Sequence, residues 1–272
     1  MKKSNTDFWH VILMIIMIIP CITAIFPFIY MLLTSLEQKR VLSFSFDWSN
    51  MNFLNYQRIF TNFDFLHYTK NSLIVSFSAC LLNCLICAMA AYGFEKKRFP
   101  GREAIFFIYI ATLMIPGQVT LIPVFVIMKY IGLLNSYPAL FLPIINAFGV
   151  FLIRQFMVGL PDELIDAAHI DGSGELHTFF RIVLPLSIPV LISLVVFTFI
   201  STWNDFVWPL VISTDSRMHT LTLALSVLRG NYSTNYGLVM AGSMLTFLFP
   251  FVLYVFLQKQ FVEGIALSGT KA

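Results

Sequence analysis

The sequence predicts an all-α membrane protein with six transmembrane helices, and its composition supplies the first evidence. Charged residues make up 11% of the 272 residues, whereas a soluble globular protein carries roughly a quarter. Hydrophobic residues reach 58%, so the chain has too little charge to cover a surface of this size in water. Lipid is therefore the expected solvent for much of the surface, which excludes a disordered chain and a small disulfide-bonded domain. The net charge of +3 is small and its basic residues are scattered, which gives no surface for a nucleic acid.

Six apolar runs are long enough to cross a membrane, because a spanning helix needs about 20 predominantly apolar residues. They lie at 9–36, 72–94, 104–128, 139–157, 186–210 and 237–257. The first run follows Lys2 and Lys3 in the manner of a secretory signal, but a signal core has only about 7 to 15 residues. We therefore expect an uncleaved helix, kinked near Pro20 and Pro27.

An even number of spans places both termini on the same side of the membrane. Lys and Arg are more numerous in the segments on that side, and the densest group lies at 96–102. The positive-inside rule then predicts cytoplasmic termini in a protein of the cell membrane. The predicted organisation is an N-terminal segment with the first transmembrane helix (1–36), an extracytoplasmic loop (37–70), a transmembrane core (71–260) that includes the inner loop 160–185, and a cytoplasmic C-terminal tail (261–272).

Polar residues inside the third and fourth runs are candidates for a substrate pathway. Pro116, Gly117 and Pro123 interrupt the third run around Gln118, and such breaks are tolerated only where protein or a wet cavity satisfies the freed backbone groups. Gln118 therefore lies either on a pathway or at a structural kink. Asn146 in the fourth run is equally ambiguous, because a hydrogen bond between helices would also explain it.

Trp203, Asn204 and Asp205 lie toward the outer end of the fifth run. An ionisable group at membrane depth is a functional hypothesis by default. An aromatic face beside amide and carboxylate groups also suits a sugar. The alternative is an interfacial Trp next to a polar cluster that packs helices together.

The inner loop at 160–185 predicts a short helix from Pro161 to Asp171. Pro161 suits the first helical position, Asp162 and Glu163 complement the positive end of the helix dipole, and Gly172 can take the left-handed conformation that ends a helix. A second helix is expected at about 175–184, before Pro185. Residues that recur at helical spacing predict a narrow face of the first helix that another surface could approach closely; they are Leu164, Ala167, Ala168 and Asp171.

This loop resembles the EAA signature of the membrane subunits of binding-protein-dependent ABC importers. The matching residues are Asp166-Ala167-Ala168, Gly172 and Ile182-Val183-Leu184-Pro185, with the spacing of the signature at every position. Further segments are similar to the sugar-importer branch of this family, of the maltose permease G type; they are Asn71-Ser72, Tyr92-Gly93-Phe94, Phe99-Pro100-Gly101-Arg102, Trp203-Asn204-Asp205-Phe206 and the tail from Gln258 to Gly264.

The resemblance implies a type I ABC importer fold and a permease subunit that forms half of a translocation pathway for a carbohydrate. It implies four kinds of partner: a second homologous permease subunit, two cytoplasmic ATPase subunits that bind ATP and Mg, an extracellular solute-binding protein, and the lipid bilayer. In the maltose system the partner permease supplies most substrate contacts, which favours the packing interpretation of Trp203, Asn204 and Asp205.

The resemblance also implies which residues contact the ATPase. The coupling helix and its exit would supply Asp162, Glu163, Leu164, Asp166, Ala167, Ala168, Asp171, Gly172, Leu184 and Pro185, and the tail would supply Gln258, Lys259, Gly264 and Gly269. Asp166 stands where the signature usually has Glu, so an ion pair made by it would be closer or mediated by water. The ending of the chain also departs from the Gly-rich ending of relatives.

Two other classes of function compete with a permease subunit. A self-sufficient secondary transporter needs coupling carboxylates or broken helices in corresponding halves, and Asp205 is the one plausible acid within a span. Dependence of uptake on ATP or on an ion gradient would separate the two classes. An enzyme is disfavoured because the sequence has no H-E-x-x-H, G-x-S-x-G or phosphate-binding G-x-x-x-x-G-K-[ST] motif. Cys80, Cys84 and Cys87 share a helix stripe without His or acidic neighbours, so we expect no metal site and no cofactor in this chain.

Overall fold

The computed structural model describes residues 3–41, 43–231 and 235–269 and is all-helical over these ranges. Within them, three helices are long and apolar enough to cross a membrane, at Ile16–Ser35, Phe65–Lys96 and Tyr236–Lys259. Three further spans arise if each strongly bent pair of helices counts as one. These findings confirm the prediction of an all-α membrane protein, and the six predicted spans are reached when each bent pair is counted as one. The chain divides into two compact units, Met1–Phe65 with Leu225–Leu248, and Leu66–Ala224 with Phe249–Ala272.

The first unit joins the N-terminal helix to the segment that follows it. It holds α1 (Lys3–Ser35), α2 (Leu54–Asn62), the end of α13 (Leu221–Asn231) and the start of α14 (Tyr236–Gly269). The side chain of Asn55 is fully buried and donates to the carbonyl oxygens of Ser35 and Glu37, at 2.9 and 2.8 Å. A Cβ on Gly237 would collide with the carbonyl oxygen of Glu37. The beginning of α14 is therefore packed directly against the chain that leaves α1.

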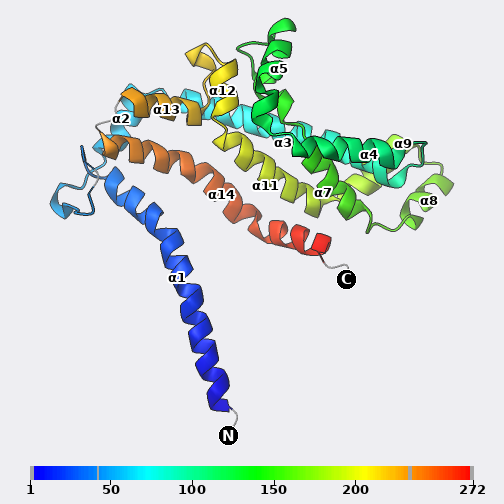
Figure 1. Cartoon of the computed structure of the whole chain (residues 1–272), viewed down its shortest axis with the longest axis horizontal. Coiled ribbons are helices and arrows are strands. Elements are labelled where there is room, and N and C mark those ends of the chain that lie inside the picture. Colours follow the sequence, from blue (N-terminus) through cyan, green and yellow to red (C-terminus); the bar gives the residue numbers. More distant parts are fainter. Residues whose placement is uncertain (1–2, 42, 232–234, 270–272) are drawn as a thin grey trace. The chain divides into compact units, whose positions relative to one another are not determined.

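The second unit contains the helices that position the candidate site. Figure 1 shows α3, α4, α7 and α11 side by side, and α7 packs against both α4 and α11. The helices of this unit are α3 (Phe65–Lys96), α4 (Arg102–Ala111), α5 (Gly117–Tyr130), α6 (Tyr137–Phe141), α7 (Ala147–Met157), α8 (Glu163–Ile170), α9 (Glu175–Thr178), the π-helix η4 (Phe179–Val183), α10 (Leu184–Leu186), α11 (Ile188–Asn204) and α12 (Val207–Ile212).

Small residues let α3 approach its neighbours closely, as is common between helices in membranes. Ala88 and Ala91 are fully buried in the core of this unit, together with Ile153 and Leu194. Gly149 on α7 lies in the same core, where an added Cβ would be 2.7 Å from the sulfur of Cys87 and 3.1 Å from a methyl group of Leu194. Glycine is therefore required there by space.

Two members of the cysteine stripe of α3, Cys80 and Cys84, face α11, whereas the Cys87 thiol donates to the carbonyl oxygen of Asn146 just before α7. The thiols of Cys80 and Cys84 donate to the carbonyl oxygens of Val195 and Leu191, at 3.6 and 3.8 Å. Between them, the amide of Asn83 donates to the Thr198 hydroxyl at 2.9 Å, and both side chains are buried. Over the described residues, no group of three or more His, Cys, Asp or Glu side chains could hold a metal ion. These thiols and the amide thus act as polar contacts between two helices.

Three of the predicted spans are sharply bent. The third bends by 103° between Met114 and Gly117, at the interruption that the sequence predicts. The fourth bends by 48° before Ala147, which the sequence analysis did not foresee. There the side chain of Asn146 begins α7 by accepting a hydrogen bond from the backbone N–H of Gly149 at 3.1 Å.

The prediction of one continuous helix at 186–210 is wrong. A bend of 76° separates Leu186 from Ile188, and α11 ends at Asn204. Asp205 follows, and its Oδ1 accepts hydrogen bonds from the backbone N–H groups of Val207 and Trp208 at 3.1 and 3.3 Å. An acidic side chain that satisfies the first N–H groups of a helix favours a new start, so α12 begins here as a separate helix.

The space around Gly149 gives a testable prediction. Gly149→Ala should lower the midpoint of thermal unfolding of the detergent-solubilised protein, because overpacking a tight core costs about 1 to 3 kcal/mol. Gly93→Ala is the matched control, since Gly93 is also helical and an added Cβ there meets nothing within 4 Å. Adding Cys87→Ala to Gly149→Ala should recover much of the loss. Equal midpoints for the two single variants would contradict this account of the packing.

Candidate functional site: the α8 loop and the cavity beside α5

The inner loop folds into the predicted short helix, with a start that differs in detail. α8 runs from Glu163 to Ile170, and Asp162 is its N-cap. The carbonyl oxygen of Asp162 accepts hydrogen bonds from the N–H groups of Ile165 and Asp166, at 2.9 and 3.0 Å. Pro161 therefore lies before the helix and not at its first position, which corrects the prediction by two residues. The side chain of Asp162 makes no capping hydrogen bond because it is engaged elsewhere.

The end of α8 is formed as the sequence predicts. Gly172 has a φ of 80°, in the left-handed region that costs other residues steric strain. Its N–H donates to the carbonyl oxygen of His169 at 3.0 Å, and the N–H of Ser173 donates to that of Ala168 at 2.9 Å. This pair of bonds is the Schellman arrangement, which satisfies the last carbonyl groups of a helix. The chain reverses at Gly172 and enters α9.

One side of α8 is buried and the other is free. Ile165 and Ala168 are buried against the rest of the unit, so Ala168 does not belong to the open face that the sequence analysis assigned to it. The exposed face of α8 carries Glu163, Leu164, Asp166, Ala167, Ile170 and Asp171.

Two exposed apolar residues of this region were not among the predicted contact residues. Ile170 is 86% exposed, and Leu176 in α9 is 66% exposed, compared with 44% for Leu164. Ile170 lies three residues after Ala167, so helical spacing could have revealed it. Exposed apolar side chains among three acidic ones form a surface suited to contact with another protein.

The end of α3 holds both ends of the α8 loop through ion pairs. The Lys96 ammonium lies 2.6 Å from a carboxylate oxygen of Asp162 and donates to the carbonyl oxygen of Leu160 at 2.7 Å. The hydrogen bond from Lys96 to the Asp162 carboxylate holds the pKa of that carboxyl below its usual range, so the group is ionised at neutral pH. Lys97 pairs with Glu175 at 2.5 Å, and the Tyr92 hydroxyl donates to the same carboxylate at 3.0 Å.

The acids of α8 thus divide into two groups. Asp162 is bound to its own chain, whereas Glu163, Asp166 and Asp171 make no ion pair with any residue that the structure describes. The free acids are the ones able to meet a partner.

The exit of the loop is formed by α10, which follows η4 directly. Leu184 and Pro185 are its first two residues; Leu184 packs on the core and Pro185 takes an early helical position.

A third basic residue ties neighbouring helices together at this end of the unit. The guanidinium of Arg154 on α7 lies 3.0 Å from Glu95 on α3 and 2.8 Å from Glu103 on α4. It also stacks 3.9 Å above the ring of Phe106. The base of the α8 loop is therefore fixed to three helices.

The predicted tail residues all belong to one helix. α14 continues to Gly269 and includes Gln258, Lys259, Gly264 and Gly269. Gln258 and Lys259 are exposed, and the Gln258 amide donates to the carbonyl oxygen of Val255 at 3.1 Å. The last three residues of the predicted tail, 270–272, lie outside the described residues.

The candidate pathway residues are separated by the structure. Gln118 and Asp205 line one cavity of about 350 Å³, between α5, the turn Leu142–Ile144 (η3) and α12. Trp203 is 1% exposed and stacks on Phe199, with ring centroids 5.4 Å apart. Asn204 donates to the carbonyl oxygen of Ile200 at 2.9 Å, and Asn146 caps α7. Trp208, which the sequence does not single out, lines the cavity three residues after Asp205.

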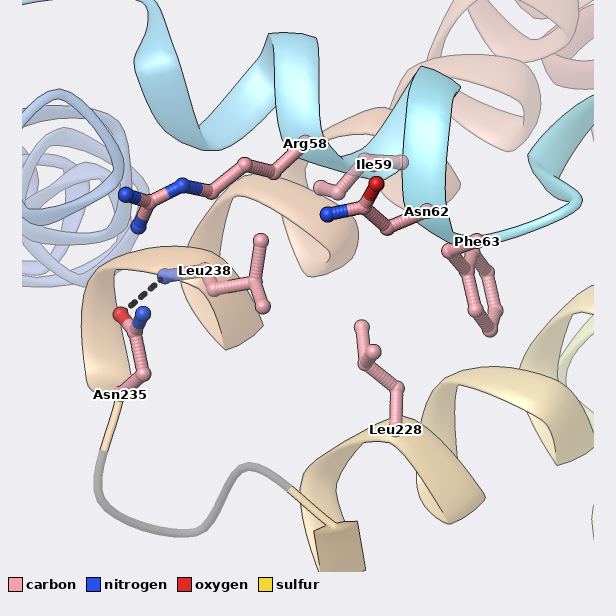
Figure 2. A pocket seen from close by; sticks show the side chains of 7 residues that line it. All are labelled: Arg58, Ile59, Asn62, Phe63, Leu228, Asn235 and Leu238. Atoms are coloured by element: carbon pink, nitrogen blue, oxygen red, sulfur yellow. Dashed lines mark hydrogen bonds between the residues drawn. The ribbon is translucent and has the colours of Figure 1, made fainter.

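A smaller pocket lies in the first unit, with a volume of about 170 Å³. Figure 2 shows α2, α13 and the start of α14 around it, with Ile59 and Leu238 among the apolar side chains and Arg58 among the polar ones. The Asn235 side chain accepts a hydrogen bond from the N–H of Leu238 at 3.1 Å, which satisfies a free group at the start of α14. One polar residue of the lining, Asn235, thus serves the start of α14, and Arg58 and Asn62 supply the other polar groups.

Comparison with known proteins decides the family of this chain. Residues 83–263 match the family model described as "Binding-protein-dependent transport system inner membrane component". The chain belongs to this family. It is a permease subunit, a multi-pass protein of the inner membrane, and not the catalytic component of its transport system.

Curated relatives of this permease have similar lengths. It is 35% identical to "Arabinooligosaccharides transport system permease protein AraQ" of Halalkalibacterium halodurans, over 91% of both chains. It is 34% identical to "Lactose transport system permease protein LacG" of Rhizobium radiobacter, over 89% of both. A third relative is "sn-glycerol-3-phosphate transport system permease protein UgpE" of Yersinia pestis, 37% identical over 72% of this chain and 70% of that one.

A solved structure confirms the fold of the permease. It is titled "Crystal structure of a bacterial ABC transporter involved in the import of the acidic polysaccharide alginate", and the TM-score is 0.82 over 95% of this chain and 98% of that one, at 22% identity. The expected ABC importer fold is thus confirmed. The family also excludes the alternative of a self-sufficient secondary transporter, because its members work with a binding protein.

The Lys96 pair gives a prediction for this permease. Lys96→Gln should speed amide hydrogen exchange in α8 by about two- to fivefold, because an ion pair of this kind contributes up to about 1 kcal/mol. Arg98→Gln is the matched control, since Arg98 is exposed, carries the same charge and lies two residues away. Equal exchange in the two variants would mean that Lys96 does not hold the start of α8.

Proposed function

We propose that this permease forms half of the translocation pathway of an ATP-driven carbohydrate importer. Two relatives support the substrate class, because they are named for transport of arabinooligosaccharides and of lactose. A second, homologous permease subunit completes the membrane part, two ATPase subunits supply the energy, and an extracellular binding protein delivers the sugar. The observation that carries the proposal is the exposed face of α8, where free acids and apolar side chains adjoin a helix fixed to the membrane bundle.

Both termini face the cytoplasm in this proposal. The Lys96 contact with Asp162 joins the basic segment at 96–102 to the start of α8. These two elements therefore share one side of the membrane, and the positive-inside rule assigns dense basic segments to the cytoplasm. Counting spans from this side returns both ends of the chain to it. The loop at 37–70 is then extracytoplasmic, where a binding protein can approach the permease.

Coupling depends on the rigid attachment of α8. In this proposal the ATPase binds the residues of the exposed face, with Asp166 and Asp171 in polar contacts and Leu164 and Ala167 in apolar ones. Its movement passes through Ile165 and Ala168 to the core, and through Leu184 and Pro185 to α11. Two discrete arrangements of packed helices can then exchange access to the two sides of the membrane. ATP drives the exchange because its binding favours one of the two arrangements.

Two further groups of residues complete the proposal. The end of α14 extends the contact with the ATPase through Gln258, Lys259, Gly264 and Gly269. Gln118 and Asp205 lie on the pathway, whereas Asn146, Trp203 and Asn204 hold the helices that border it.

Uptake by the complete importer tests the function. Cells that express both permease subunits, the ATPase and the binding protein should accumulate radiolabelled lactose, maltotriose or arabinotriose. Depleting ATP should abolish uptake, and deleting the binding protein should do the same, because neither the energy source nor the delivery step lies in this chain. A protonophore applied while ATP is maintained should leave uptake intact. Uptake that follows the proton gradient and ignores ATP would reject the proposal.

The left-handed turn at Gly172 tests the coupling role. Gly172→Val places a β-branched residue at a φ of 80°, which costs about 1 to 3 kcal/mol of strain, and should reduce the sugar transported per ATP hydrolysed while the complex still assembles. Gly174→Val is the control, because Gly174 has a φ of −75° and an added Cβ meets nothing within 4 Å. The parental ratio of transport to hydrolysis in Gly172→Val would count against coupling through α8.

A further inference from the structure

We propose that the cavity between α5, η3 and α12 is a carbohydrate-contact site supplied by this subunit, and that Asp205 makes it favour uncharged sugars over anionic ones. The inference rests on the proposed function as a carbohydrate importer. It adds a binding site to that function and names the class of ligand that the site selects.

Two helix starts build the cavity. α5 begins at Gly117, directly after the 103° bend, and places Gln118 and Thr120 in its first turn. α12 begins after Asp205, whose Oδ1 accepts the N–H groups of Val207 and Trp208. Pro143 and Ile144 of η3 contribute apolar lining between them. The site thus combines polar side chains with apolar walls, as ligand pockets do.

The lining groups suit a sugar. The Trp208 indole donates through Nε1 to the carbonyl oxygen of Ala139 at 2.9 Å, which fixes its ring at the wall. An aromatic face can pack against the C–H groups of a sugar ring. The side chain of Gln118 is exposed and makes no hydrogen bond to the described part of the chain, so its amide can both donate to and accept from hydroxyl groups. The volume of about 350 Å³ falls within the range of small-molecule sites.

The charge of the lining sets the selectivity. Among the described residues around the cavity, Asp205 is the one charged group, and none is Lys, Arg or His. Sugar hydroxyls can donate to a carboxylate in short hydrogen bonds. A carboxylate or phosphate on the ligand would instead meet a like charge, and the repulsion is stronger in a low-dielectric site than in water. Uncharged sugars are therefore favoured.

The test labels a cysteine placed in the cavity of the complete importer, reconstituted in nanodiscs. Gln118→Cys is made in a Cys21→Ala background, because Cys21 is exposed, whereas Cys80 and Cys87 are buried and the partly buried Cys84 thiol donates to the carbonyl oxygen of Leu191. The thiol is treated with methanethiosulfonate reagents carrying an ammonium or a sulfonate group. The cationic reagent should react with this thiol roughly tenfold faster than the anionic reagent, after each rate is divided by the rate of the same reagent with free cysteine. Adding Asp205→Asn should remove this preference, since Asn still caps a helix and only the charge is lost.

Protection by sugars provides the second measurement. Lactose, maltotriose or arabinotriose should slow labelling of the cavity cysteine by about fivefold at saturation, whereas trigalacturonate at the same concentration should not. Thr61→Cys on the exposed surface of α2 is the control, and no sugar should protect it. If Gln118→Cys fails to assemble, Thr120→Cys reports on the same cavity.

The outcomes separate this inference from the proposed function. If none of the neutral sugars protects the cysteine while ATP-driven, binding-protein-dependent uptake persists, the inference is overturned and the function stands. If trigalacturonate protects as well as the neutral sugars, or Asp205→Asn leaves the reagent preference unchanged, the role of Asp205 is overturned. Loss of ATP dependence in the uptake assay would instead reject the function itself.

Discussion

Inside a bilayer every backbone N–H and C=O group must find a partner within the protein, and this requirement decides where the helices can break. The structure places a polar side chain at two of these breaks. Asn146 supplies the acceptor that begins α7, and Asp205 supplies the acceptor that begins α12. These two polar residues therefore accept hydrogen bonds from backbone N–H groups at helix starts, whatever further role they have. The break before α5 and the one before α12 also open the cavity, so the same constraint shapes the fold and the candidate pathway.

The α8 loop is held in a different way, because its position depends on ion pairs with side chains at the end of another helix, α3. Lys96 and Lys97 are consecutive residues, yet Lys96 holds Asp162 before α8 and Lys97 holds Glu175 after it. Buried Ile165 and Ala168 fix the helix from beneath. A helix of eight residues would be marginal alone in water. Held at both ends and along one side, it can pass on a displacement with little bending of its own.

Much of the architecture follows from the sequence. Six apolar runs predict the spans, and the signals at Asp162 and Gly172 predict a short helix close to where α8 lies. The bend before Gly117 also follows, since Pro116 and Gly117 mark it.

The break at Asp205 could not be predicted in the same way, because an acid in an apolar run fits a pathway, a packing contact or a cap, and only the backbone geometry distinguishes them. Pairing was equally hidden: nothing in the local sequence says that Asp162 is bound to Lys96 while Asp166 stays free. Trp203 and Trp208 illustrate the limit. Trp203 lies two residues before Asp205 and is buried, whereas Trp208 lies three residues after it and lines the cavity.

The π-helix η4 has a consequence for how this loop tolerates change in length. A π-turn holds one residue more than an α-turn, and each residue of an α-helix advances about 100° around its axis. Deleting a single residue from Phe179–Val183 would let this turn relax to α-geometry with little rotation of α9 relative to α10, whereas the same deletion in a regular α-helical turn would rotate the preceding segment by about 100°. The ion pair between Glu175 and Lys97 would then be kept, and α8 would keep its direction. The π-turn is therefore the place in this loop where the chain can lose one residue without changing the direction of the exposed face of α8.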